Sequence, residues 1–176
     1  MSSLKKLRTT YLDLVLIHFP RGPIYGYRGI IKSIGVSNYE VCHLIELQIY
    51  AKYPPAVNQI EFHPYFTRPT LVKYCQRNGV FVQAFTSLLW GNKEILDEPN
   101  VLQLAKKFAV TPQTILYAFG LCSGVGIIPR STKPARIRDN LVKVAAISLS
   151  DSEINSLNDL DRNAAFCPGC KPWKCL

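Results

Sequence analysis

The chain has 176 residues, 48% hydrophobic and 19% charged, so a single globular domain with a substantial core is expected. Its formal net charge is +9, but lysine and arginine are scattered and no helical stretch carries a continuous basic stripe, which argues against a nucleic-acid partner. No apolar run reaches the roughly 18 to 20 residues of a membrane-spanning helix, which argues against a membrane protein.

The amino terminus carries basic residues followed by an apolar run, a pattern that signal peptides share. Asp13 and His18 interrupt this run, and no small-residue cleavage site follows it. We therefore interpret residues 11–18 as a strand and expect a cytoplasmic protein.

The six cysteines fall into two groups. Three stand among apolar residues in helical patterns and are interpreted as small core side chains: Cys42, Cys75 and Cys122. For the other three we expect solvent-exposed thiols, with a disulfide or metal role as the alternative: Cys167, Cys170 and Cys175. No histidine stands near them in sequence to complete a zinc site, so no metal is expected.

Five short apolar segments predict strands. They span residues 11–18, 33–36, 56–62, 80–86 and 126–128. The first is apolar throughout except for Asp13, which is typical of a strand buried on both faces of a parallel sheet.

Helical patterns follow most of these segments. Serine and glutamate at positions 37 and 40, and again at 150 and 153, predict capping boxes that begin helices. Further helices are predicted from Pro69 to Gly79, after Thr111-Pro112, and from Pro134 through Val144. Alternating strands and helices imply parallel strands with right-handed crossovers, in either an open doubly wound sheet or a closed barrel. No G-x-G-x-x-G run follows a strand, which disfavours a Rossmann sheet.

Five segments in order make the chain recognisable: YLDLVLIHFP, IKSIGVSNYE, PAVNQIEFHPYF, VFVQAF and GIIPRSTKPARIRDN. Together they resemble the aldo-keto reductases, a family that folds as a parallel (β/α)8 TIM-type barrel and reduces aldehydes and ketones to alcohols with NADPH. The resemblance assigns residues 1–163 to a partial barrel and residues 164–176 to a Cys-rich tail.

The resemblance implies roles for residues near the strand ends, where a barrel places its ligand groups. His18 matches the active-site histidine that orients and polarises the carbonyl of a small substrate. The trio that hydrogen-bonds the nicotinamide carboxamide is matched by Ser37, Asn38 and Gln59, for which capping and strand-end bonding is the alternative.

Phe85 stands where the family usually has a tyrosine stacked on the nicotinamide ring, and keeps the stacking face. Thr86 and Leu88 belong to the next segment, which wraps the pyrophosphate in the family. Here the hydroxyls are kept, while the proline and the early glycine of the family pattern are replaced.

The last segment matches the adenosine end of the cofactor site. Arg130, Ser131 and Thr132 resemble the group that binds the 2′-phosphate, and Arg136 the residue that stacks on adenine. Asp139 and Asn140 match positions that contact the adenine amino group. A guanidinium, hydroxyls and a helix start suit a phosphate dianion, so the resemblance favours NADPH over NADH; an ordinary capped basic helix is the alternative.

Two features of the sequence predict weak or no catalysis by this chain. His63, in EFHPYF, is interpreted as a packing residue. The family's remaining catalytic residues, an aspartate, a tyrosine and a lysine, come before the segment at Tyr11, so we expect an incomplete barrel of about five strands that lacks its first three strand-helix units. Such a chain is expected to bind NADPH with weak or no catalysis, and to self-associate through unpaired strand edges. The alternative is a non-catalytic nucleotide-binding or regulatory module that pairs with a full-length relative.

Overall fold

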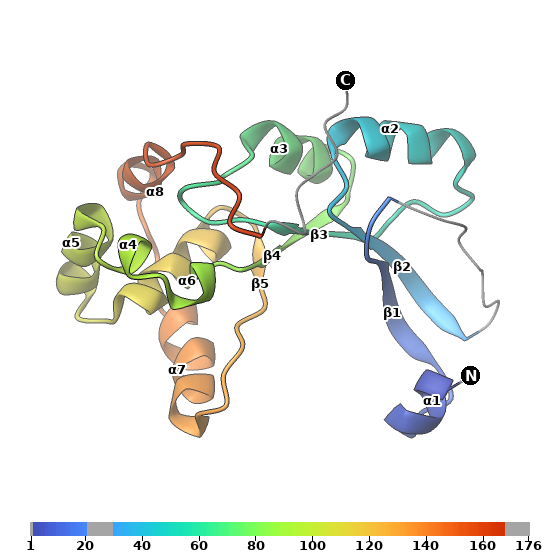
Figure 1. Ribbon diagram of the computed structural model, residues 1–176, viewed down its shortest axis with the longest axis horizontal. Helices are drawn as coiled ribbons and strands as arrows, with labels where there is room; N and C mark the ends of the chain where they lie inside the picture. Colours follow the sequence, from blue (N-terminus) through green and yellow to red (C-terminus); the bar gives the residue numbers. More distant parts are fainter. Residues whose placement is uncertain (1, 21–29, 168–176) are drawn as a thin grey trace. The chain divides into compact units, whose positions relative to one another are not determined.

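The computed structural model describes residues 2–20 and 30–167 (Figure 1). The chain divides into two compact units. Among the described residues, the first unit comprises those up to Ile60 together with 70–82, and the second comprises 61–69 and 83–167.

A parallel sheet contains the five strands β1 (Leu12–Ile17), β2 (Ile31–Ser37), β3 (Val57–Glu61), β4 (Phe81–Phe85) and β5 (Gly126–Ile127). Each lies on one of the five segments predicted from the sequence, and β2 begins two residues earlier than predicted. In the sheet the strands follow one another in chain order. An order without a reversal is that of a (β/α) barrel, whereas a doubly wound sheet reverses direction at its switch point.

In the first unit, α1 (Ser2–Leu7) precedes β1, and α2 (Val41–Tyr50) and α3 (Pro69–Arg77) follow β2 and β3. The helices bury one face each, with Leu44 and Leu47 on α2 and Leu71 on α3 almost inaccessible to solvent. Gly35 in β2 is packed tightly, since a Cβ there would lie 2.5 Å from a methyl carbon of Leu16 and 2.9 Å from the main-chain oxygen of Val57.

β1 is more exposed than its sequence predicts. Leu14 keeps 38% of its surface exposed, and the other apolar residues of this strand are only half-buried. The prediction of a strand buried on both faces is therefore wrong. The physical reason is its position at an edge of the sheet, where it pairs with β2 alone among the described strands.

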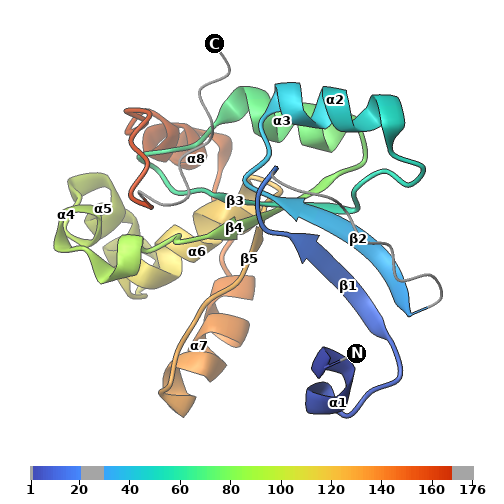
Figure 2. The same ribbon diagram turned by 45° about the vertical axis from the view of Figure 1, so that its right-hand side comes forward.

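The second unit contains a short 3-10 helix (Leu89–Gly91), α4 (Lys93–Leu96), α5 (Pro99–Phe108), α6 (Pro112–Cys122), α7 (Pro134–Ala145) and α8 (Asp151–Asn158). α6 is its central element: every residue from 114 to 120 is buried, and the helix lies against β5 (Figure 2). The ring of Phe119 on α6 stacks on Phe62, with ring centroids 5.4 Å apart.

The helix starts confirm most of the sequence predictions. Thr111 caps α6 by accepting the amide of Thr114, and Ser150 caps α8 by accepting the amide of Glu153. The predicted capping box of residues 37–40 is wrong, because residue 37 ends β2 and the N-cap of α2 is Glu40. The amide of Glu40 donates to Nδ1 of His43 at 3.0 Å.

The structure contradicts the predictions for two cysteines. Cys42 is exposed on α2 and disulfide-bonded, so it is not a core side chain. Cys167 is half-buried and also disulfide-bonded, which is the alternative left open for the tail and not the exposed thiol that was expected. Cys75 is buried and Cys122 half-buried, and neither is in a disulfide. Cys170 and Cys175 lie outside the described residues.

The described part of the chain contains no helix that is long and apolar enough to cross a membrane. It also contains no group of three or more histidine, cysteine, aspartate or glutamate side chains that could hold a metal ion.

Candidate functional site

The carboxyl ends of β1, β2 and β3 bring three sequence-predicted residues to one level in the first unit. Ile17 pairs with Val36, and Val36 pairs with Asn58. One residue further along each strand stand His18, Ser37 and Gln59, the last two paired directly. The polar ends of three neighbouring strands therefore form one row along the sheet edge.

Hydrogen bonds hold this row together. Ser37 is buried, and its hydroxyl donates to the main-chain oxygen of Gln59 at 2.9 Å. Asn38 is also buried, and its Nδ2 donates to the hydroxyl oxygen of Ser37 and to the main-chain oxygen of His18, both at 3.1 Å. Asn38 has a left-handed backbone with φ of 62°, a conformation that asparagine tolerates better than most residues.

His18 itself is exposed, and its ring stacks on Phe19 with centroids 4.3 Å apart. The ring of His18 is therefore not a buried side chain satisfied by the backbone. Its main-chain oxygen, not its ring, is what Asn38 contacts.

Sequence reasoning missed Asn58, whose side chain holds the main chain just after the row. It is fully buried, its Nδ2 donates to the main-chain oxygen of Tyr39 at 2.9 Å, and its Oδ1 accepts the amide of Tyr39 at 3.4 Å. The two bonds fix the chain immediately after Asn38. The one signal in the sequence was an asparagine inside an apolar strand segment, directly before the candidate ligand Gln59.

In the second unit, Phe85 and Thr86 stand at the end of β4. Phe85 is half-buried, and its main-chain oxygen accepts the amide of Phe62 at 3.5 Å. Thr86 is left-handed with φ of 57°, and its carbonyl accepts the amide of Leu89 at 2.9 Å, so the chain turns sharply here. Leu88, inside this turn, is half-buried, and its carbonyl accepts the amide of Gly91 at 2.7 Å.

The sequence-predicted phosphate group lies on the loop after β5 and the first half of α7. Arg130, Thr132 and Arg136 are exposed, and within the described residues neither arginine has an ion-pair partner. Ser131 accepts the amide of Lys133 at 3.1 Å and so shapes the turn before the helix. No side chain caps α7.

Further along α7, Asp139 and Asn140 are both half-buried. Asp139 pairs with Lys143 one turn later, with 3.0 Å between Oδ2 and Nζ. Its carboxylate therefore already has a partner on its own helix.

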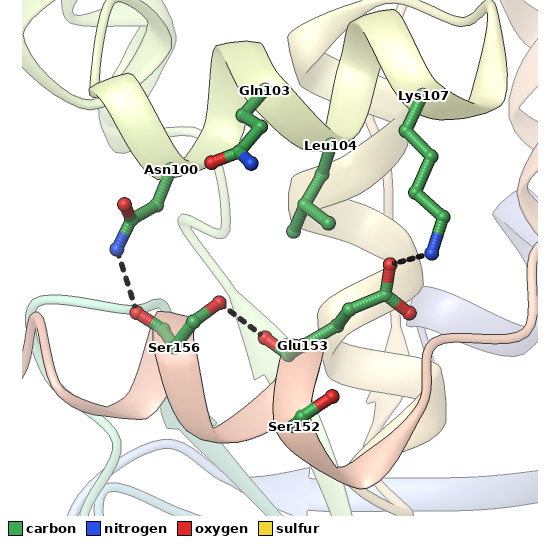
Figure 3. A pocket seen from close by; sticks show the side chains of 7 residues that line it. All are labelled: Asn100, Gln103, Leu104, Lys107, Ser152, Glu153 and Ser156. Atoms are coloured by element: carbon green, nitrogen blue, oxygen red, sulfur yellow. Dashed lines mark hydrogen bonds and ion pairs between the residues drawn. The ribbon is translucent and has the colours of Figure 1, made fainter.

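A separate groove of about 500 Å³ lies between α5 and α8 (Figure 3). Its polar side chains pair with one another: Lys107 with Glu153 at 2.7 Å, and Asn100 with the main-chain oxygen of Ser156 at 3.0 Å. None of the sequence-predicted site residues lines it.

Known proteins with similar sequences identify the family to which this chain belongs. The sequence model of the aldo/keto reductase family matches residues 1–162. The chain belongs to this family. Its members reduce carbonyl compounds with NAD(P)H.

The chain is 36% identical over 177 residues to an uncharacterized oxidoreductase, YtbE, of Bacillus subtilis, covering 95% of this chain and 62% of the relative. It is 30% identical to the NADP-dependent D-sorbitol-6-phosphate dehydrogenase of Malus domestica, covering 98% and 69%. A solved aldo-keto reductase of Bombyx mori in complex with NADP superposes with a TM-score of 0.84 at 29% identity, over 94% of this chain and 62% of that one. The chain thus spans about two thirds or less of these family members.

Proposed function

We propose that this chain is the carboxyl-terminal portion of an NADPH-binding aldo-keto reductase barrel, residues 1–163, followed by a Cys-rich tail. The observation that carries the proposal is the pair of exposed guanidinium groups, Arg130 and Arg136, beside the uncapped start of α7. The guanidinium of Arg130 and the amides of a helix start suit the 2′-phosphate that distinguishes NADPH from NADH, and we propose that Arg136 stacks on adenine. NADP-bound and NADPH-bound relatives support the cofactor.

The residues of the first unit fit the nicotinamide end. Both hydrogen bonds from the Asn38 side chain use Nδ2, and within the described chain its Oδ1 accepts none. That oxygen is left to accept the N–H of a carboxamide, and we propose Ser37 and Gln59 beside it as further polar contacts. Phe85, Thr86 and Leu88 are proposed to contact the nicotinamide ring and the pyrophosphate, and Ser131, Thr132, Asp139 and Asn140 the adenosine end.

When bound, NADPH supplies a hydride for a carbonyl carbon. We propose His18 as the residue that orients and polarises the carbonyl of a small aldehyde or ketone, since its ring is exposed at the end of β1. A proton donor placed on the carbonyl oxygen contributes roughly 10²- to 10⁴-fold to such reactions. Because we propose that the family's aspartate, tyrosine and lysine have no counterpart here, we expect this chain to bind NADPH with little or no turnover.

One observation favours a second candidate function, a non-catalytic module that pairs with a full-length relative or with a second copy. Tyr11, just before the edge strand β1, is 41% exposed, and Leu14, within this strand, is 38% exposed. An apolar edge strand is a template for another strand. A concentration-dependent sedimentation coefficient, or co-purification with a full-length reductase, would support this function.

Fluorescence titration of the purified chain with NADPH and, separately, with NADH tests the first proposal. We expect NADPH to bind at least tenfold more tightly, because only NADPH carries the 2′-phosphate. Equal binding of both nucleotides would refute the assignment of the phosphate group. Adding an aldehyde to the NADPH complex and following the loss of reduced nicotinamide then measures whether His18 supports any reduction.

A further inference from the structure

A buried carboxylate in the second unit has a set of partners that the proposed function does not use. Glu61 ends β3 and is 2% exposed. Its Oε1 lies 2.9 Å from Nε2 of His63, and it accepts the main-chain amide of Phe166 at 2.7 Å and that of Cys167 at 3.1 Å. One carboxylate thus binds two consecutive amides of a segment about a hundred residues away in sequence, a spacing that no local pattern in the sequence reveals.

The side chain of His63 is completely buried and faces this carboxylate. Because an ionised carboxylate only accepts hydrogen bonds, the proton of the contact sits on Nε2 of the imidazole. Nδ1 is buried and has no hydrogen-bond partner among the described residues.

The amides of Phe166 and Cys167 belong to a segment, residues 161–167, whose remaining residues dock on the loop that follows β3, residues 62–67. The main-chain oxygen of Tyr65 accepts the amides of Arg162 and Ala164, at 3.4 and 3.1 Å. Asp161 accepts both the amide and the hydroxyl of Thr67. Figure 1 shows this segment, in red after α8, returning to the loop after β3.

Side chains of segment 161–167 and of the loop after β3 also contact one another. The guanidinium of Arg162 lies 3.8 Å above the Tyr65 ring and pairs with Glu94 at 2.6 Å. The ring of Phe166 meets His63 edge-on, with centroids 5.7 Å apart. These side chains add to the main-chain contacts between the two segments.

We infer that Glu61 and His63 form a latch for the chain's own segment 161–167, in which the ionised carboxylate of Glu61 binds two consecutive backbone amides and His63 orients it. Glu61 is the group whose charge holds the latch. The amides point at an anion, so the bonds are charge-assisted, and protonation of Glu61 removes that assistance. Among the described residues, Asp161 and Arg162 are charged side chains of the segment itself, Glu94 pairs with Arg162, and Glu98 is linked to the docking loop by the Tyr65 hydroxyl. They hold its opposite end and do not contact the two amides.

Residue-resolved hydrogen exchange by NMR tests the latch without any cofactor, so the result is independent of the proposed function. A thiol reductant is present throughout, so that the disulfide of Cys167 cannot hold the segment in place of Glu61. In the Glu61→Gln variant, we expect the protection factors of the Phe166 and Cys167 amides to fall at least tenfold. Those of helix α6 should stay unchanged. The matched control is Glu153→Gln, a glutamate of the same unit whose partners are Lys107 and Ser150.

A second arm uses the wild-type chain, in case the variant does not fold. Protection of the same two amides should be lost on acidification before that of the α6 amides. Unchanged protection in a folded Glu61→Gln variant, or two amides that remain as protected as α6 until the whole chain unfolds, would overturn the inference.

Discussion

The side chain of Asn38 donates to the main-chain oxygen of His18 at 3.1 Å, and so ties the residue after β2 to the residue after β1. The same Nδ2 donates to the hydroxyl oxygen of Ser37. Three residues that the family resemblance assigns to substrate and cofactor are therefore fixed by one amide group. Their spacing depends on hydrogen bonds within the protein before any ligand binds.

Replacing Asn38 by aspartate removes these donors while keeping a side chain that tolerates the left-handed backbone. We expect the free energy of unfolding to fall by about 1–3 kcal/mol, since a buried carboxylate would face the His18 oxygen. Urea denaturation measures it. The control is Asn163→Asp, at an exposed left-handed position with φ of 53°, which should change stability little. Equal stability of the two variants would show that the Asn38 bonds contribute nothing.

Gly35 offers a test of packing between β1, β2 and β3. A methyl group there meets a backbone oxygen at 2.9 Å, and the backbone cannot move away cheaply. Gly35→Ala should therefore destabilise the chain by about 1–3 kcal/mol. Gly120→Ala is the comparison, because its new methyl would lie nearest a side-chain methyl of Ile127, at 3.0 Å, with the closest backbone oxygen at 3.8 Å, and alanine favours the helix. A smaller loss for Gly35→Ala than for Gly120→Ala in thermal unfolding would contradict the packing described.

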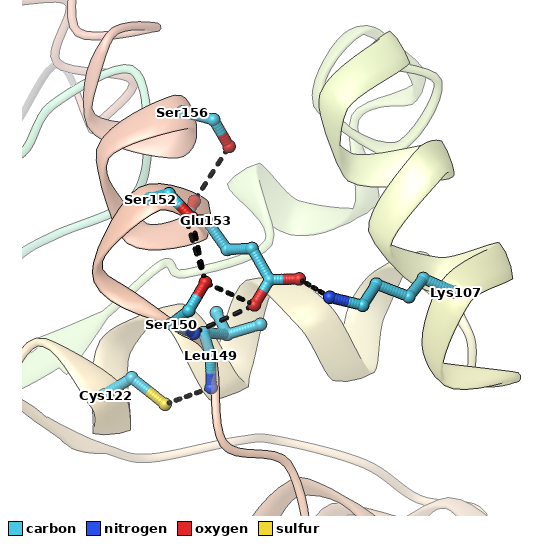
Figure 4. A network of polar contacts seen from close by, with 7 residues as sticks. All are labelled: Lys107, Cys122, Leu149, Ser150, Ser152, Glu153 and Ser156. Carbon is cyan, nitrogen blue, oxygen red and sulfur yellow. Dashed lines mark hydrogen bonds and ion pairs between the residues drawn. The ribbon is translucent and has the colours of Figure 1, made fainter.

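The start of α8 separates the contribution of a cap from that of a surface ion pair (Figure 4). Ser150 accepts the amide of Glu153, while Glu153 pairs with Lys107, whose side chain is 62% exposed. We expect Ser150→Ala to lower the unfolding free energy by about 1 kcal/mol and Lys107→Ala by about 0.5 kcal/mol or less. Chemical denaturation of both variants measures the order, and a reversed order would contradict it.

Glu61 should make stability depend on acidic pH. Burial opposes its ionisation, but the hydrogen bonds from His63 and from the amides of Phe166 and Cys167 outweigh burial and hold the pKa of Glu61 below its ordinary value of 4.5. A lowered pKa in the folded state means that the carboxylate stabilises the fold above the ordinary value, and that this contribution is lost as the pH falls through the lowered pKa. Unfolding free energies of wild type and Glu61→Gln should therefore converge on acidification. A constant difference down to the acid limit of folding would contradict this assignment.

Local sequence patterns predicted where the helices and strands lie better than they predicted how buried each element is. The strand at residues 12–17 was found from its apolar run, but its exposure depends on what lies beside it in the sheet, which a run of residues does not encode. α5 was not predicted, although Pro99 at its start and the spacing of Val101, Leu104 and Ala105 are helical signals that could have found it. The capping box assigned to residues 37–40 shows how a local motif can be displaced by a strand that extends further than expected.

The candidate site shows the same division. His18, Ser37 and Gln59 were proposed from segments read separately, and the strand register places them at one level. The partners of Asn58 and Glu61 were not predictable, because Tyr39 and Phe166 lie far from them in sequence. Such contacts exist only once the chain has folded.

NADPH titration of charge variants tests the central claim most directly. Arg130→Ala combined with Arg136→Ala should weaken NADPH binding by about 100-fold, because the pairing of Arg130 with the 2′-phosphate and the stacking of Arg136 on adenine each contribute about 1 kcal/mol or more. NADH binding should fall less, because NADH loses only the stacking on adenine. Arg138→Ala is the matched control, since it removes an exposed arginine from the same helix. Selective loss in the double variant alone is the result we predict. An equal loss in the Arg138→Ala control, or NADPH binding that survives both substitutions, would contradict a phosphate site at the start of α7.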